Sequence, residues 1–180
     1  MDSIKIIYED KDILAVNKPT GLMTHSDGRS KEKTLADLVL EKYPEIKNVG
    51  ESIKLDSGEE IEKPGIVHRL DKETSGVILI AKNQAEFLFL KNQFQERKIK
   101  KTYQAIVYGH VKNDTGIIDA PIARSSTDFR RWSASRGKRG KEREAVTEYK
   151  VIKRFTAPSG NFLGPRVASL LRPRKRGKQS

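Results

Sequence analysis

The feature that most constrains the fold is a short apolar run over residues 77–81, which directly follows a polar stretch over residues 65–76. The run is rich in β-branched residues and is bounded by Gly76 and Lys82, which predicts a β-strand. Because the run is apolar throughout, we expect a strand that is covered on both faces, in the centre of a sheet. Polar side chains that adjoin such a rigid element are well placed to form a functional site.

Asp71 stands out within this polar stretch because it is flanked by two cations, Arg69 and Lys72. Nearby positive charge favours the ionised form of a carboxyl group. An Asp that precedes a Thr-Ser-Gly sequence can also simply cap a turn through its own backbone. The spacing alone therefore leaves two interpretations of Asp71, a reactive carboxylate and a turn residue.

The charge of the chain favours a polyanionic partner. Its 180 residues carry a net charge of +12, and charged residues make up 33% of the sequence. We expect nucleic acid, ahead of a membrane surface, as the partner; a generally basic and well-solvated surface is the alternative. A chain of this length suits one domain with a substantial core.

Several classes of protein are disfavoured by what the sequence lacks. It contains no cysteine, which excludes disulfides and thiolate metal sites. His25, His68 and His110 have no ligand spacing, so we expect no metal site. Only Asp71 stands out among the carboxylates, whereas a glycosidase needs a facing pair. No apolar run has the length of a membrane-spanning helix and no signal-peptide core is present, so we expect a soluble, cytoplasmic protein. We also expect a monomer.

Hydrophobic periodicity divides the rest of the chain into short elements. Residues 4–8 and 13–16 predict a hairpin around a polar turn at residues 9–12. Thr34 and Asn83 are the predicted N-caps of two helices. The full set of predicted elements is strands at residues 4–8, 13–16, 77–81, 101–109, 115–121 and 145–155, helices at residues 34–43 and 83–98, and a surface loop or weak hairpin at residues 45–64.

A shift in composition marks residues 124–143, where basic side chains crowd a Ser- and Gly-containing stretch with Phe129 and Trp132 interleaved. Basic groups meet phosphates and exposed aromatic faces stack on unpaired bases, so this stretch suits RNA. The alternative is a flexible basic loop whose Trp132 folds back on the core. The candidate RNA-binding residues are Arg124, Arg130, Arg131, Arg136 and Arg139.

The string His-Arg-Leu-Asp-x-x-Thr-Ser-Gly at residues 68–76, followed by an apolar strand, resembles the signature of the RluA-type pseudouridine synthase family. Two further strings add to the resemblance. They are Lys-Pro-x-Gly at residues 18–21 and Lys-x-Tyr-x-Ala-x-Val-x-Gly at residues 101–109. The resemblance covers most of the chain, from about residue 6 to residue 155.

The resemblance implies an α+β fold with a central, mixed but largely antiparallel sheet and helices packed on its faces. It implies an enzyme that isomerises specific uridines in structured RNA, ribosomal or transfer RNA, to pseudouridine, with no cofactor and no metal. Asp71 would be the catalytic carboxylate, and Tyr103 would lie against the target base. The residues that the resemblance places at the substrate are Arg69, His68, Lys18 and Thr74. His68 has the alternative role of holding the loop.

The resemblance ends near residue 155, because the family's next motif, Thr-Gly-[Arg/Lys]-Thr-His-Gln-x-Arg-x-His, is absent. In the family that motif supplies a basic residue beside the catalytic Asp. We therefore expect a catalytic domain over residues 1–155 that is incomplete at its C-terminus, and a basic, disordered tail over residues 156–180. A second hypothesis follows, a catalytically defective RNA-binding remnant of the same fold.

Overall fold

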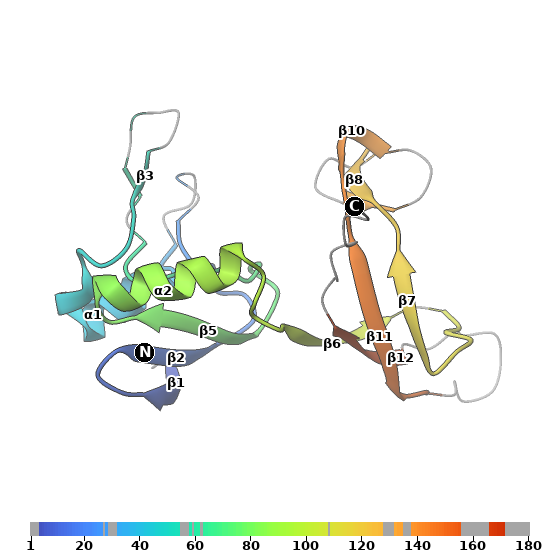
Figure 1. The fold of residues 1–180 in the computed structure, drawn as a ribbon, viewed down its shortest axis with the longest axis horizontal. Coiled ribbons are helices and arrows are strands. Elements are labelled where there is room, and N and C mark those ends of the chain that lie inside the picture. The colour runs from blue at the N-terminus through green and yellow to red at the C-terminus, as the bar shows by residue number, and fades with distance from the viewer. Residues whose placement is uncertain are drawn as a thin grey trace, which may run out of the picture. The chain divides into compact units, whose positions relative to one another are not determined.

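The computed structural model describes residues 4–26, 28, 32–54, 58, 60–61, 63–107, 109–127, 132–134, 138–155 and 166–171. They belong to two compact units, Met1–Ile99 and Lys100–Ser180 (Figure 1). The boundary falls within the range that the sequence presents as one catalytic domain. The α+β class is confirmed, because helices and strands are both present and every described strand pair is antiparallel. The described strands form four hydrogen-bonded sheets.

The first unit is built on a three-stranded sheet in the order β1 (Lys5–Glu9), β2 (Ile13–Lys18) and β5 (Gly76–Ala81). The predicted hairpin of β1 and β2 is confirmed. Asp10 closes its turn, since Oδ1 accepts the N–H groups of Asp12 and Ile13 at 2.8 and 2.6 Å. The buried apolar side chains on these strands are Leu14, Ala15, Val16, Ile78, Ile80 and Ala81.

The position of β5 differs from the expectation for the apolar run. β5 pairs with β2 along one edge, and among the described residues its other edge carries only an isolated bridge between Ile66 and Ile80. The prediction of a central strand is therefore wrong. The prediction that both faces of the strand are covered is only partly correct. Ile78 and Ile80 on one face are fully buried, whereas Val77 on the other face is 52% exposed. An apolar run identifies a strand, but its place in the sheet depends on distant partners.

Both predicted helices are confirmed, and each begins at its predicted cap. α1 (Leu35–Lys42) follows Thr34, which forms a capping box with Asp37. α2 (Gln84–Gln95) follows Asn83, whose side chain accepts the N–H of Glu86 at 2.9 Å. α2 stops before the predicted end at residue 98, near Arg97 with its φ of 58°. Neither helix described here is long and apolar enough to cross a membrane.

Figure 1 shows α2 lying along β5. Phe87 and Leu90 of the helix form a buried cluster with Ala81, and Val67 and Leu79 pack against it. This contact joins the polar stretch before β5 to the helix after it. Between α1 and β5 the chain forms a short 3-10 helix, η1 (Pro44–Ile46), and a two-stranded hairpin of β3 (Ile53–Lys54) and β4 (Glu60–Ile61), which agrees with the weak hairpin expected there.

The second unit consists of two antiparallel sheets, ordered β6-β12-β11-β7 and β10-β8-β9. Its strands are β6 (Thr102–Val107), β7 (Thr115–Asp119), β8 (Ile122–Ser125), β9 (Trp132–Ser133), β10 (Lys138–Arg143), β11 (Val146–Lys153) and β12 (Arg166–Leu171). β6, β7 and β11 confirm the predicted strands. β8, β9 and β10 lie largely in the basic stretch, to which the sequence assigns no strand.

β12 lies in the range for which the sequence predicts a disordered tail, and that prediction is wrong for these six residues. Leu170 lies opposite Tyr103 of β6 on one side and opposite Tyr149 of β11 on the other. Two neighbouring strands therefore satisfy the backbone of β12. Local patterning does not reveal pairing with strands so distant in the sequence. The other residues of the predicted tail, 156–165 and 172–180, lie outside the described residues.

Gly65→Ala should destabilise the first unit. Gly65 has a φ of 62°, and a Cβ there would overlap the carbonyl oxygen of Ala81. We expect the free energy of unfolding, measured by urea denaturation, to fall by at least about 3 kcal/mol. Gly58→Ala is the matched control, because Gly58 has a φ of 84° but an added Cβ meets nothing within 4 Å. The control should lose only about 1 kcal/mol, and equal losses would contradict the close approach at Gly65.

Candidate active site

Residues 65–76, here called the signature loop, leave and rejoin the sheet at β5. The carbonyl of Gly65 accepts the N–H of Ala81 at 2.9 Å, and Ile66 forms a bridge with Ile80. The loop then returns to the start of the same strand. Both of its ends are therefore fixed on one rigid element, so the polar residues between them have little freedom to move.

His68 holds the signature loop between β5 and α2. Its Nε2 accepts the N–H of Leu79 at 3.0 Å. Its ring stacks on Phe94 of α2, with centroids 4.6 Å apart and an interplanar angle of 21°. Because Nε2 is an acceptor, the neutral ring carries its proton on Nδ1. These contacts give His68 the loop-holding role that the sequence leaves open; a contact with substrate stays a prediction.

Thr24 fixes the backbone of Leu70, the residue before Asp71. Its hydroxyl donates to the Leu70 carbonyl at 2.8 Å and accepts the Leu70 N–H at 3.3 Å. Thr24 is buried, so water does not compete for these bonds. The sequence gives no sign of this clamp, because the two residues are 46 positions apart.

Lys18 is fully buried at the start of the Lys-Pro-x-Gly loop, residues 18–21. Its ammonium donates to the backbone carbonyls of Pro19, Leu22 and Lys72, at 3.0, 2.7 and 3.1 Å. An ammonium group has three N–H donors, so all of them are used. Burial lowers the pKa of Lys18, and the carboxylates of Glu73 and Asp71 act in the opposite direction. The predicted substrate contact of Lys18 does not fit this geometry, which makes it a positioning residue.

Two more hydrogen bonds join the Lys-Pro-x-Gly loop to the signature loop. The N–H of Gly21 donates to the Lys72 carbonyl at 2.8 Å. The hydroxyl of Thr20 donates to the Glu73 carbonyl at 2.9 Å. Together with the buried ammonium, they hold the two residues that follow Asp71. The backbone of Asp71 is thus fixed on both sides, and none of these clamps uses its side chain.

Asp71 presents an exposed carboxylate on this fixed backbone. Its backbone carbonyl accepts the N–H of the half-buried Thr74 at 3.0 Å, which makes the turn. No described residue forms a hydrogen bond or ion pair with the carboxylate itself. Of the flanking cations, Lys72 pairs with Glu32 at 2.7 Å and Arg69 is exposed. The turn therefore accounts for the backbone of Asp71 and leaves its carboxylate available for chemistry.

Two cations, Arg69 and Lys63, lie beside the signature loop together with His25. Burial lowers the pKa of His25, the Ser26 carbonyl opposes this effect, and the charges of Lys63 and Arg69 lower the pKa further. Burial also lowers the pKa of Lys63, with a second contribution from Arg69. Arg69 and Lys63 therefore supply a positive field that favours the neutral form of His25, and this field suits the phosphate oxygens of a nucleic acid.

The remaining predicted residues belong to the second unit, whereas Asp71 belongs to the first. Tyr103 is half-buried on β6, opposite Leu170 of β12. Arg124 of β8 and Arg139 of β10 lie directly opposite each other. The other candidate RNA-binding residues lie outside the described residues, and they are Arg130, Arg131 and Arg136.

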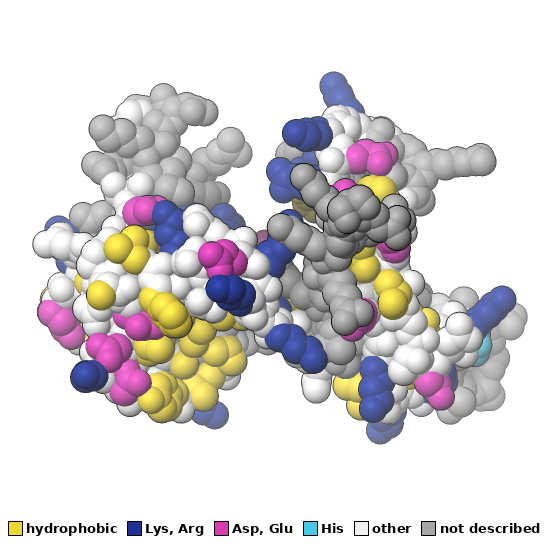
Figure 2. Space-filling model, viewed as in Figure 1, with side chains coloured by type: hydrophobic (Ala, Val, Ile, Leu, Met, Phe, Trp, Pro, Cys, Tyr) yellow, Lys and Arg dark blue, Asp and Glu magenta, His cyan; other side chains and the backbone are white. Residues whose placement is uncertain are grey.

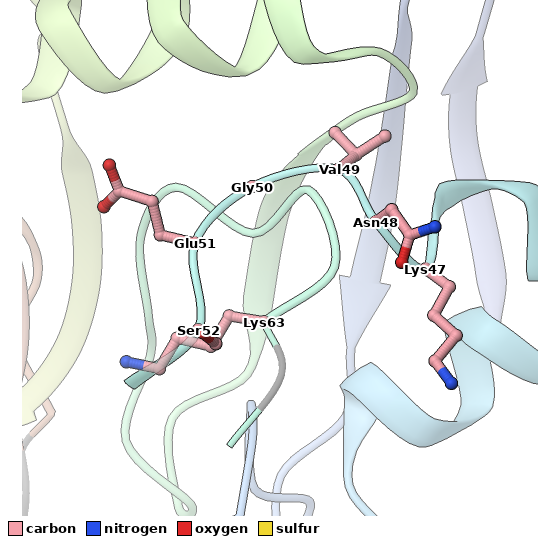
Figure 3. Close-up of a pocket in the computed structure, with 7 residues that line it drawn as sticks. All are labelled: Lys47, Asn48, Val49, Gly50, Glu51, Ser52 and Lys63. Carbon is pink, nitrogen blue, oxygen red and sulfur yellow. The ribbon is translucent and has the colours of Figure 1, made fainter. Parts of the chain in front are cut away.

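A pocket of about 320 Å³ opens beside the chain segment before β3 (Figure 3). Its lining residues are Lys47, Asn48, Val49, Gly50, Glu51, Ser52 and Lys63. None of the predicted site residues lines the pocket, but Lys63 also belongs to the positive group beside the signature loop. Across the described ranges, no group of three His, Cys, Asp or Glu side chains is placed to hold a metal ion.

Lys18→Met should release the two loops from each other. It removes three hydrogen bonds from buried carbonyls, and we expect the free energy of unfolding to fall by about 2–4 kcal/mol in urea denaturation. Lys11→Met is the control, because the Lys11 side chain is 90% exposed, and its effect should stay below about 0.5 kcal/mol. A Lys18→Met protein as stable as the wild type would contradict the positioning role.

Stability should fall on acidification in a way that depends on His25. Its pKa in the folded protein is lowered from 6.5, so the unfolded chain binds a proton that the folded protein resists. This contribution to stability is fully present above pH 6.5 and is lost as the pH falls through that value toward the lowered pKa. His25→Gln should therefore lose less stability than the wild type between about pH 7.5 and about pH 5. Identical losses, measured by urea denaturation, would refute the role of His25.

Comparison with known proteins extends over most of the chain. A family model described as RNA pseudouridylate synthase matches residues 12–177, which passes beyond the residue at which the resemblance was expected to end. The chain is 46% identical over 153 residues to an uncharacterized RNA pseudouridine synthase of Aquifex aeolicus, covering 84% of this chain and 44% of that protein. It is 38% identical over 164 residues to the ribosomal large subunit pseudouridine synthase D of Borreliella burgdorferi, covering 91% and 47%.

The chain thus spans about half the length of the curated relatives that it matches. Among solved structures, human RNA pseudouridylate synthase domain containing 1 matches with a TM-score of 0.64 and 24% identity, over 93% of this chain and 58% of that chain. A likeness at this identity supports the fold alone. The family match itself covers nearly the whole chain, and the relatives are well above 30% identical. The chain therefore belongs to the RNA pseudouridylate synthase family, which confirms the RluA-type resemblance.

Proposed function

We propose that this chain isomerises a uridine of RNA to pseudouridine, with Asp71 as the catalytic carboxylate. The observation that carries the proposal is the exposed carboxylate of Asp71 on a backbone that buried contacts fix on both sides. A fixed backbone limits where the carboxylate can go, and this preorganisation is what catalysis requires of a reacting group. The family of the chain supplies the class of reaction.

The reaction breaks the bond between ribose C1′ and uracil N1, rotates the base and joins C1′ to uracil C5. N1 takes up a proton and C5 loses one, so the product is an isomer of the reactant and no redox cofactor is needed. The reacting atoms are inaccessible inside a stacked helix, which means that the base must leave the stack. Asp71 attacks the ribose or the uracil ring, or stabilises the charge that develops as the bond breaks.

The other residues of the site have supporting roles in this proposal. Arg69 and Thr74 contact the RNA beside Asp71, since both lie in the signature loop and their side chains are at least partly exposed. Tyr103 stacks on the displaced uracil or forms a hydrogen bond with it. The positive group around Arg69 binds the phosphates next to the target nucleotide.

We propose ribosomal RNA, ahead of transfer RNA, as the substrate. The support is the name of the relative from Borreliella burgdorferi, which refers to the ribosomal large subunit. The positive charge of the chain suits either RNA.

A second candidate function is RNA binding without turnover. It is favoured by the net charge of +12, which supports RNA as a ligand whether or not the chain carries out the reaction. The two candidates agree on the ligand and differ in the chemistry.

Asp71→Asn should abolish turnover while RNA binding stays within about threefold of the wild type. Turnover is measured as tritium released from ribosomal RNA that carries uridine labelled at C5, and the loss should exceed about a hundredfold. Glu73→Gln is the matched control, because it neutralises an exposed carboxylate two positions away and should keep most of the activity. Full activity in Asp71→Asn would refute the catalytic role, and RNA binding by a wild-type protein without turnover would establish the second candidate.

A further inference from the structure

Trp132 occupies an unusual place for the only tryptophan of the chain. It lies on β9, directly opposite Arg124 of β8, and its side chain is 41% exposed. The guanidinium carbons of Arg124 and Arg143 lie 4.6 and 4.9 Å from the centroid of its ring. The alternative that the sequence left open, a tryptophan folded back on the core, does not hold. The ring lies at the surface, in contact with two cations.

The residues around Trp132 form a row across the sheet. Arg124 lies opposite Trp132 on one side and opposite Arg139 of β10 on the other. Directly opposed residues of antiparallel strands project from the same face, so these three side chains share one face of the β8–β9–β10 sheet. Ala123, the neighbour of Arg124 on the strand, is fully buried and belongs to the opposite face.

The charge of this sheet is strongly positive. Among its described side chains are the cations Arg124, Arg139, Lys141 and Arg143, against one carboxylate, Glu142. Figure 2 shows Lys and Arg side chains gathered at the end of the second unit where β8 and β10 lie. Two guanidinium groups near one ring concentrate positive charge there, which favours the approach of a phosphate.

We propose that the β8–β9–β10 face binds an unpaired segment of RNA, with Trp132 stacking on one base and Arg124, Arg139 and Arg143 binding the flanking phosphates. An unpaired base can replace a guanidinium on the exposed ring, since every base has a π-face. The released guanidinium then reaches the backbone of the same strand. A base inside a duplex cannot make this contact, because its faces are covered by its neighbours.

This inference rests on the proposed function, which makes RNA the ligand, and it adds the surface that selects unpaired RNA. It also assigns different functions to the two units of the chain. The signature loop of the first unit carries the reactive carboxylate, whereas the β8–β9–β10 face of the second unit recognises the single-stranded form of the substrate.

The first test uses the fluorescence of Trp132, which reports on this side chain alone because the chain has no other tryptophan. The full chain is titrated with a single-stranded oligoribonucleotide and, separately, with a duplex RNA of the same length. We expect saturable quenching by the single strand, weaker at high salt, and little quenching by the duplex. No quenching, or equal quenching by both RNAs, would overturn the proposal.

The second test compares affinities for the same single strand. Trp132→Leu should weaken binding by about 5- to 100-fold, the effect of losing one stacked base, and Trp132→Phe should recover much of it. Phe155→Leu is the matched control, because Phe155 is another exposed aromatic residue with a cation, Lys153, 5.1 Å from its ring centroid. The control should stay within about twofold of the wild type. Equal losses in the Trp132→Leu and Phe155→Leu proteins would overturn the assignment to Trp132.

Tritium release by the same preparations separates this inference from the proposed function. Binding that depends on Trp132, in a wild-type protein that releases no tritium, would support the surface and overturn the proposed catalysis. Tritium release by the wild type, together with single-strand binding that the Trp132→Leu substitution does not change, would support the catalysis and overturn the proposed binding surface.

Discussion

The buried ammonium of Lys18 is the interaction on which the site depends. A buried charge destabilises the folded state unless hydrogen bonds and dipoles replace its hydration. Three backbone carbonyls replace the hydration of this ammonium. Two of these carbonyls, those of Pro19 and Leu22, lie within four residues of Lys18, and the third belongs to Lys72 in the signature loop. The two loops therefore have one stable arrangement relative to each other. The position of Asp71 follows from that arrangement, because Lys72 is its direct neighbour in the chain.

Local elements of the first unit could be predicted from the sequence because their determinants are local. The hairpin turn depends on Asp10, and the two helices depend on the caps Thr34 and Asn83. The edge position of β5 could not be predicted in the same way, since it depends on which strands come to lie beside it. β12 is the sharpest case. Its six residues become an inner strand only because β6 and β11 pair with both of its edges.

The candidate site shows the same division between local and distant determinants. The motif around Asp71 could be found as a string, and so could the residues that the resemblance places at the substrate. The clamps could not be found, because Lys18 and Thr24 act on residues 54 and 46 positions away. The sequence alone does not distinguish a buried lysine from a lysine that faces a cleft. The contacts of Trp132 could not be predicted either, since only the pairing of β8 with β9 brings Arg124 to its ring.

The clamps on the signature loop also bear on how this stretch can change in evolution. Lys72 and Glu73 are held through their carbonyl oxygens, by the Lys18 ammonium, the Gly21 N–H and the Thr20 hydroxyl. Every amino acid supplies a carbonyl, so these contacts do not choose between side chains. Lys72 and Glu73 are the two x positions of the signature, so the positions that the signature leaves variable are the ones held through their backbone. Substitutions at these two positions therefore leave the backbone contacts in place, even though the positions lie one and two residues from Asp71, where the backbone is most tightly fixed.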